Sequence, residues 1–218
     1  MIVEPLQAIV ETAFPGVTLA PGFGANPISA AESHLGVALP EALKDYFSVA
    51  GGSREMMAGN FRMLAPEKLR SESAHLIFCE EDQGLEDFGI PLGELANLAT
   101  VPNPSVAVKA RKAREWFSES SSLSAFLLGV GVWQAILALP EKARCKMPKT
   151  ELKKVAAFFQ PLGAPDVRLG GHRIGLVDRK NSLLATYHYN TDLLYVGSPR
   201  EDAIEALEKR SGLDFDSL

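Results

Sequence analysis

Ala-His-Leu-Ile-Phe-Cys-Glu, residues 74–80, is a stretch that is apolar on both faces, as a central β-strand is. Asp82-Gln83-Gly84 follows it, and glycine tolerates the positive φ that a tight turn requires. Residues 85–92 form a second strand candidate directly after this turn. The pattern therefore predicts a β-hairpin.

Two helices are predicted on the N-terminal side of this hairpin. Ser29 and Glu32 have the spacing of a capping box, which predicts a helix from Ser29 to about Gly36. Pro40 suits the start of the second helix, and Gly51-Gly52 suits a left-handed end. An additional short helix is expected at about residues 6–12, and further strands at about residues 61–64 and 105–109.

Residues 120–140 contain no charged side chain, so a transmembrane helix has to be considered. Ser124, Gln134 and two glycines interrupt the run, and the remaining chain has the composition of a globular protein. We therefore expect a buried core helix at about residues 122–139 and no membrane partner.

The C-terminal third has a different pattern. Residues 141–154 are rich in lysine and are expected to be a solvated connection that leads into a helix at about residues 151–160. Strands are predicted at about residues 173–177, 183–189 and 193–196, and turn-forming residues between them indicate an antiparallel meander. Ser198 to Glu201 matches a second capping box, so a last helix is expected up to about Arg210.

Composition sets wider limits. The chain has 218 residues, 46% hydrophobic and 22% charged, which is typical of a folded protein with one large domain or a domain with an extension. Lysine and arginine number 22 against 27 aspartate and glutamate residues, a net charge of -5, which disfavours nucleic acid as a partner. Cys79 and Cys145 fit neither a disulfide framework nor a metal knuckle, and no signal peptide is readable, so a cytoplasmic location is expected.

A spaced motif in the first half of the chain resembles the opening motif of the SUKH superfamily. The matching residues are Ile28 to Gly36 (Ile-Ser-Ala-Ala-Glu-Ser-His-Leu-Gly), Leu39-Pro40-Glu41, Tyr46-Phe47 and Gly51-Gly52. Glu81-Asp82-Gln83-Gly84 is similar to the family's acidic residue and glutamine-glycine at the strand turn, and Ser122 to Leu127 resembles the start of its final helix. The resemblance covers about residues 28–139.

This resemblance implies an α+β fold in which helices flank an antiparallel or mixed sheet. It also implies a non-catalytic protein-binding role, either as an immunity protein that neutralises a bacterial toxin or, as in fungi, as a regulator of cell-wall synthesis. We accordingly divide the chain into an N-terminal helix and loop (1–27), a SUKH-like domain (28–145) and a C-terminal extension (146–218) that either extends the sheet or forms a small second lobe.

Five acidic residues gather near the hairpin turn and are the candidate partner-binding site: Glu80, Glu81, Asp82, Glu86 and Asp87. At a hairpin tip they would form a negative patch that attracts a basic protein such as a nuclease toxin. Two alternatives remain open, a simply solvated turn, and an acid–base or cation site, which would need carboxylates that converge in a cleft.

Other chemistry is weakly indicated. His172, Asp178 and His188 would be the residues of a metal-dependent hydrolase, although their spacing is looser than that of usual zinc sites. Lysine and arginine residues between Lys109 and Arg114 are expected to lie in a solvated loop. We therefore expect no enzyme activity, no cofactor and no metal.

Overall fold

The computed structural model describes residues 1–162 and 173–218, and the predicted His172 lies outside them. The chain divides into two compact units, which are described separately. Unit 1 comprises residues 1–3 and 19–127, and unit 2 comprises residues 4–18 and 128–218. Helices accompany an antiparallel sheet in each unit, so the α+β prediction is confirmed.

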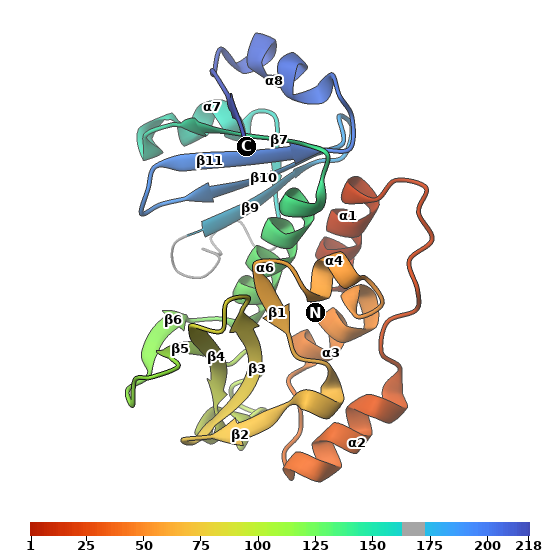
Figure 1. The fold of residues 1–218 in the computed structure, drawn as a ribbon, viewed down its shortest axis with the longest axis vertical. Helices are drawn as coiled ribbons and strands as arrows, with labels where there is room; N and C mark the ends of the chain where they lie inside the picture. The colour runs from red at the N-terminus through yellow and green to blue at the C-terminus, as the bar shows by residue number, and fades with distance from the viewer. Residues whose placement is uncertain (163–172) are drawn as a thin grey trace. The chain divides into compact units, whose positions relative to one another are not determined.

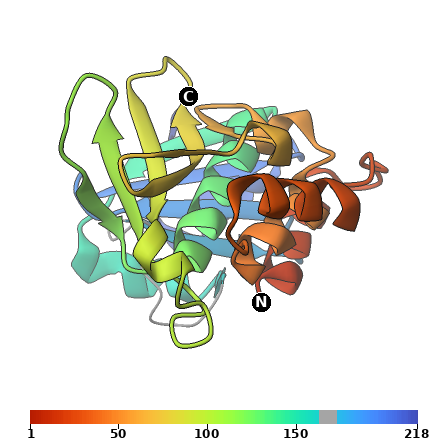
Figure 2. The same cartoon turned by 90° about the horizontal axis from the view of Figure 1, so that it is seen from below.

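Unit 1 is built on a six-stranded antiparallel sheet with the order β1-β3-β4-β5-β6, in which β2 also pairs with β3. The strands follow one another in the yellow to light green part of the ribbon (Figure 1, Figure 2). Their bounds are β1 Phe61–Met63, β2 Arg70–Glu72, β3 His75–Glu81, β4 Glu86–Pro91, β5 Val106–Ala110 and β6 Phe117–Ser120. The predicted hairpin is β3–β4, and Gly84 in its turn has a φ of +72°.

The helices of unit 1 are α2 Ala25–Leu35, α3 Glu41–Ala50, α4 Arg54–Met57, α5 Leu92–Leu95 and the 3-10 turn η1 Pro66–Lys68. The predicted capping box is wrong, because α2 begins one turn earlier, after Gly24, and Ser29 lies inside it. The Glu32 carboxylate instead accepts the backbone N–H of Leu39 at 2.8 Å and pairs with Lys44 at 3.1 Å. Glu32 therefore stabilises the connection between α2 and α3.

Gly51 and Gly52 have a different role from the predicted one. Gly51 follows α3 with a right-handed φ of -63°, so the expected left-handed end of this helix is wrong. A Cβ atom on Gly51 would collide with the ring of Phe23, and one on Gly52 would collide with the backbone of Ala20. Glycine is required here because the chain after α3 passes directly against residues 20–23.

Aromatic rings fill the core of unit 1. Phe126 is 3% exposed. Its ring lies 5.2 Å from that of Phe88, 5.6 Å from that of Phe78 and 6.3 Å from that of Phe61. These separations favour edge-to-face and tilted contacts, so the first turn of the long apolar helix is bound to the sheet of its own unit.

That helix is α6, Leu123–Ala138, and its extent agrees with the prediction. Buried residues occur on all sides of it, including Leu123, Leu127, Val132 and Ile136. Among the described residues, no helix combines the length and the apolar character needed to cross a bilayer.

Unit 2 contains a second antiparallel sheet, with the order β12-β7-β11-β10-β9-β8. Its strands are β7 Glu141–Lys146, β8 Gln160–Pro161, β9 Arg173–Asp178, β10 Leu183–His188, β11 Leu193–Ser198 and β12 Asp216–Ser217. The predicted meander is present as β9–β10–β11. The C-terminal strands thus form a sheet of their own.

The expected solvated connection at residues 141–154 is corrected by β7, which pairs with both β11 and β12. Ala143 and Cys145 are buried in the core, and the alternate residues Arg144 and Lys146 are exposed. The many charged side chains made this segment look like a solvated loop. They concealed the alternation of buried and exposed residues that is typical of a strand.

Unit 2 also contains α7 Leu152–Ala156, α8 Ala203–Ser211 and the 3-10 turn η2 Lys149–Glu151. Most of α1 Val3–Ala13 and most of α6 belong to it as well, although the first residues of both helices are part of unit 1. The second predicted capping box is also wrong. Ser198 ends β11, and its hydroxyl donates to the carbonyl oxygen of Ser182 at 2.9 Å. The helix begins only at Ala203, because the intervening residues form a turn.

Candidate functional site

The turn between β3 and β4 is held by the side chain of Glu81. Its carboxylate accepts the backbone N–H groups of Gln83 at 3.0 Å and Leu85 at 3.2 Å, and the N–H of Gly84 donates to the Glu81 carbonyl at 2.8 Å. Glu81 is therefore engaged in shaping the tip. A partner would compete with these two hydrogen bonds for its carboxylate.

Glu80 and Asp87 lie directly opposite each other in the hairpin register, one on each strand. They are only 5% and 2% exposed. The expectation that all five acidic residues project into solvent is therefore wrong for these two. Residues directly opposite each other in an antiparallel pair of strands point to the same face of the sheet, so Glu80 and Asp87 lie side by side on one face.

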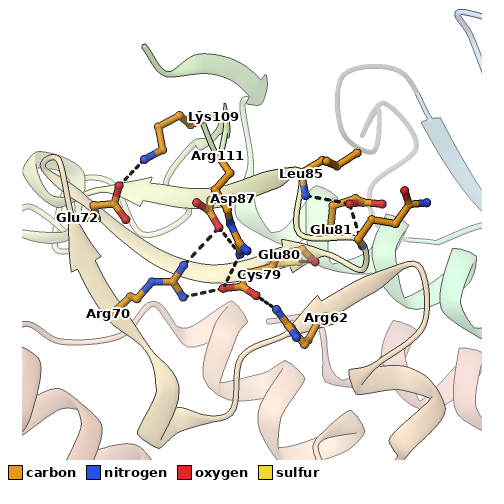
Figure 3. Close-up of polar contacts among 11 residues, drawn as sticks. Arg62, Arg70, Glu72, Cys79, Glu80, Glu81, Leu85, Asp87, Lys109 and Arg111 are labelled. Atoms are coloured by element: carbon orange, nitrogen blue, oxygen red, sulfur yellow. Dashed lines mark hydrogen bonds and ion pairs between the residues drawn. The ribbon is translucent and has the colours of Figure 1, made fainter. Parts of the chain in front are cut away.

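Three arginines neutralise this buried pair of carboxylates (Figure 3). Arg70 of β2 contacts both, with 2.8 Å between Nη1 and Glu80 Oε1 and 3.3 Å between Nη2 and Asp87 Oδ1. Arg62 of β1 pairs with Glu80 and is its neighbour in register. Arg111, just after β5, lies 3.4 Å from Glu80 and 3.5 Å from Asp87. We call these five residues the ion-pair cluster.

The ion-pair cluster keeps Glu80 ionised. Burial alone would raise the pKa of this carboxyl group, but the guanidinium groups of Arg62 and Arg70 outweigh burial. The pKa of Glu80 consequently lies below its ordinary value of 4.5. Two adjacent buried carboxylates of the same charge can persist only because the arginines surround them.

A second charged group lies on the neighbouring strands. Lys109 of β5 is the register neighbour of Asp87, is buried, and pairs with Glu72 of β2. This pairing lowers the pKa of Glu72. The ammonium group also lies 5.3 Å from the centre of the Trp116 ring, which stacks on His75 at 4.1 Å.

The prediction of a solvated loop from Lys109 to Arg114 is thus wrong for Lys109, which is buried. Lys109 lies within β5, which ends at Ala110, and its ammonium group pairs with Glu72 of β2. Lys112 and Arg114 are exposed, as expected.

The hairpin tip that remains open to solvent is smaller than predicted. Asp82 and Glu86 are exposed, and Leu85 between them is 61% exposed. We call Asp82, Leu85 and Glu86 the hairpin tip. It combines an apolar side chain with two carboxylates on a turn whose backbone is fixed by Glu81.

Asp178 and His188, two residues of the predicted hydrolase site, form contacts within unit 2. The Asp178 carboxylate accepts the backbone N–H of Asn181 at 3.1 Å and its side-chain amide at 2.6 Å. His188 lies 5.2 Å from the Trp133 ring and 4.7 Å from the Tyr195 ring. Within residues 1–162 and 173–218, no three histidine, cysteine or acidic side chains come together as metal ligands.

Sequence comparison adds no family assignment. The chain matches no protein-family model, and it matches none of the curated proteins. The resemblance to SUKH proteins stays a prediction that depends on the residues quoted above.

Proposed function

We propose that the chain is a non-catalytic protein-binding module that docks a basic partner through the hairpin tip. The observation that carries this proposal is the exposed Leu85 between the exposed carboxylates of Asp82 and Glu86. An apolar anchor with a polar rim is the usual composition of a protein interface. The turn is preorganised by Glu81, so docking costs little ordering entropy.

Charge complementarity would set the kind of partner. The chain has a net charge of -5, and the two tip carboxylates have no arginine partner in the described part of the chain. Such a surface attracts a basic protein and raises its association rate, most strongly at low salt.

The proposed partner class is a bacterial toxin, for example a nuclease, which the chain would neutralise as an immunity protein in the cytoplasm. This part of the proposal depends on the SUKH resemblance of residues 28–139. The runner-up is a cytoplasmic regulatory or scaffold protein, which the same resemblance also supports through the fungal members. The two functions differ in the identity of the partner.

Affinity capture tests the proposed function. The immobilised full chain is incubated with a panel of purified bacterial toxin domains and with a bacterial lysate. We expect a basic toxin domain to be retained at low salt and released by about 0.5 M sodium chloride, because screening removes the long-range attraction. Capture of housekeeping enzymes alone would favour the regulatory function, and capture of no protein would contradict a protein-binding module.

A further inference from the structure

Unit 1 contains a cleft of about 640 Å³ that the hairpin tip does not use. Its walls come from Phe23, from the chain after α3, from α4, from β1 with the segment that follows it as far as Arg70, and from Glu80 of β3. This volume falls in the range of small-molecule sites, about 300 to 1,000 Å³.

The charged residues that line the cleft are mostly cationic. Arg54, Arg62, Lys68 and Arg70 contribute positive charge, and Glu80 is the carboxylate among the lining residues. This excess of cations occurs in a protein whose overall charge is negative. The cations of the cleft would therefore attract an anion, even though the net negative charge of the protein repels it at longer range.

Two of the four cations form no ion pair with any residue that the structure describes. Arg62 and Arg70 belong to the ion-pair cluster, where Glu80 neutralises part of their charge. Arg54 and Lys68 are exposed, and neither pairs with a carboxylate in the described ranges. These two side chains can bind an external anion without breaking an ion pair among the described residues.

One wall of the cleft is apolar and firmly held. Phe23 packs edge-on against Phe47 of α3 at 5.7 Å, and its N–H donates to the Phe47 carbonyl at 3.0 Å. The ring also packs directly against Gly51, where an added Cβ atom would lie only 2.5 Å from it. Met57 and Leu64 also line the cleft. An apolar or aromatic group could pack there beside the cations.

We propose that this cleft binds an organic phosphate, a phosphate monoester whose remaining part is apolar or aromatic. A phosphate monoester has a charge of about -1.5 to -2 near pH 7, which suits several cations better than a single carboxylate does. Guanidinium groups donate paired hydrogen bonds to phosphate oxygens, and lysine adds a point charge. The wall containing Phe23 accommodates the organic part.

Titration calorimetry with simple probes tests this assignment on the full chain. We expect phenyl phosphate to bind with a dissociation constant of about 1 mM or tighter. Inorganic phosphate, which lacks the ring, is expected to bind several times more weakly, and phenol, which lacks the charge, is expected not to bind. Equal binding of phenyl phosphate and either inorganic phosphate or phenol would overturn the proposal, as would no binding of phenyl phosphate at about 10 mM.

The double variant Arg54→Ala/Lys68→Ala locates the site. It removes two exposed side chains that form no ion pair in residues 1–162 and 173–218, so folding is preserved. We expect phenyl phosphate to bind about tenfold more weakly to this variant. The matched control is Lys112→Ala/Arg114→Ala, which removes two exposed cations of the same unit that do not line the cleft. The control should bind as the wild type does.

Two results would overturn the proposal at this stage. Equal affinities of the double variant and the control would place phosphate binding elsewhere. Tighter binding of a short peptide with glutamate beside phenylalanine than of phenyl phosphate would assign the cleft to an acidic segment of a protein.

Discussion

Replacing Arg70 with alanine is expected to lower the free energy of unfolding by about 2 kcal/mol at pH 7. Arg70 contacts both buried carboxylates, at 2.8 Å and 3.3 Å, and lies closer to them than Arg111 does. Without it, Glu80 and Asp87 remain buried with weaker compensation from Arg62 and Arg111. Loss of a fully buried partner costs more, about 3 to 5 kcal/mol, but the Arg70 side chain is 40% exposed. Urea denaturation measures the difference.

Measuring the stability of the Arg70→Ala variant at acid pH separates the loss of ion pairs from the loss of packing. The pKa of Glu80 is lowered in the folded protein, so its ion pairs stabilise the fold above pH 4.5, and this stability is lost as pH falls through the folded-state pKa. The difference in stability between the wild type and Arg70→Ala should therefore shrink as the pH falls below 4.5. A difference that stays the same at pH 3 and pH 7 would show that Arg70 acts through packing. Arg114→Ala, which removes an exposed arginine, should change little at either pH.

Replacing Phe126 with alanine is expected to cost about 3 to 5 kcal/mol. The Phe126 ring is buried and contacts three other phenylalanines of the unit 1 sheet. Truncation leaves a cavity and removes these aromatic contacts, which add about 0.5 to 1.5 kcal/mol per pair beyond burial. Urea denaturation followed by circular dichroism measures the loss.

The controls for this variant are a conservative change and an exposed phenylalanine. Phe126→Leu refills much of the cavity and should cost less than Phe126→Ala. Phe117→Ala removes a ring that is 60% exposed and should be nearly neutral. A small effect of Phe126→Ala would mean that α6 contributes little to the core of unit 1.

The elements that follow from local pattern were predictable from the sequence. The β3–β4 hairpin and the long apolar helix are continuous stretches with a clear turn or a uniform composition. Gly84 was assigned its positive φ because the turn chemistry requires it. Strand β7 was missed because Lys142, Arg144 and Lys146 concealed the buried alternation of Ala143 and Cys145.

The two predicted capping boxes show the limit of local signals. Ser29 and Ser198 each precede glutamate at the right spacing, but their hydroxyl groups do not cap a helix in the structure. Glu32 forms contacts with Leu39 and Lys44 instead. A tertiary contact thus replaced the local one.

Only part of the candidate site could be found from the sequence. Strand alternation and a hairpin register indicate that Glu80 and Asp87 share a face, so their separation from Asp82 and Glu86 was accessible in principle. The arginines that neutralise them come from three separate segments, and only the sheet order brings these together. The sheet order also brings Arg62 and Arg70 together in the cationic cleft, so the cleft could not be predicted from the sequence.

The central claim is that the hairpin tip docks a basic protein partner, and charge reversal tests it most directly. The variant Asp82→Lys/Glu86→Lys changes two exposed carboxylates and leaves Glu81, which holds the turn, unchanged. The control Glu115→Lys/Glu201→Lys makes the same change in net charge at two exposed positions that are not part of the hairpin tip. Each form is immobilised, and the proteins it captures are quantified by mass spectrometry.

We expect at least one basic protein to be captured by the wild type and by the control, and to be reduced about tenfold or more on the tip variant. A tenfold loss corresponds to about 1.4 kcal/mol, which is reasonable for two reversed charges at an interface. Equal capture of every protein by all three forms would contradict docking through the hairpin tip.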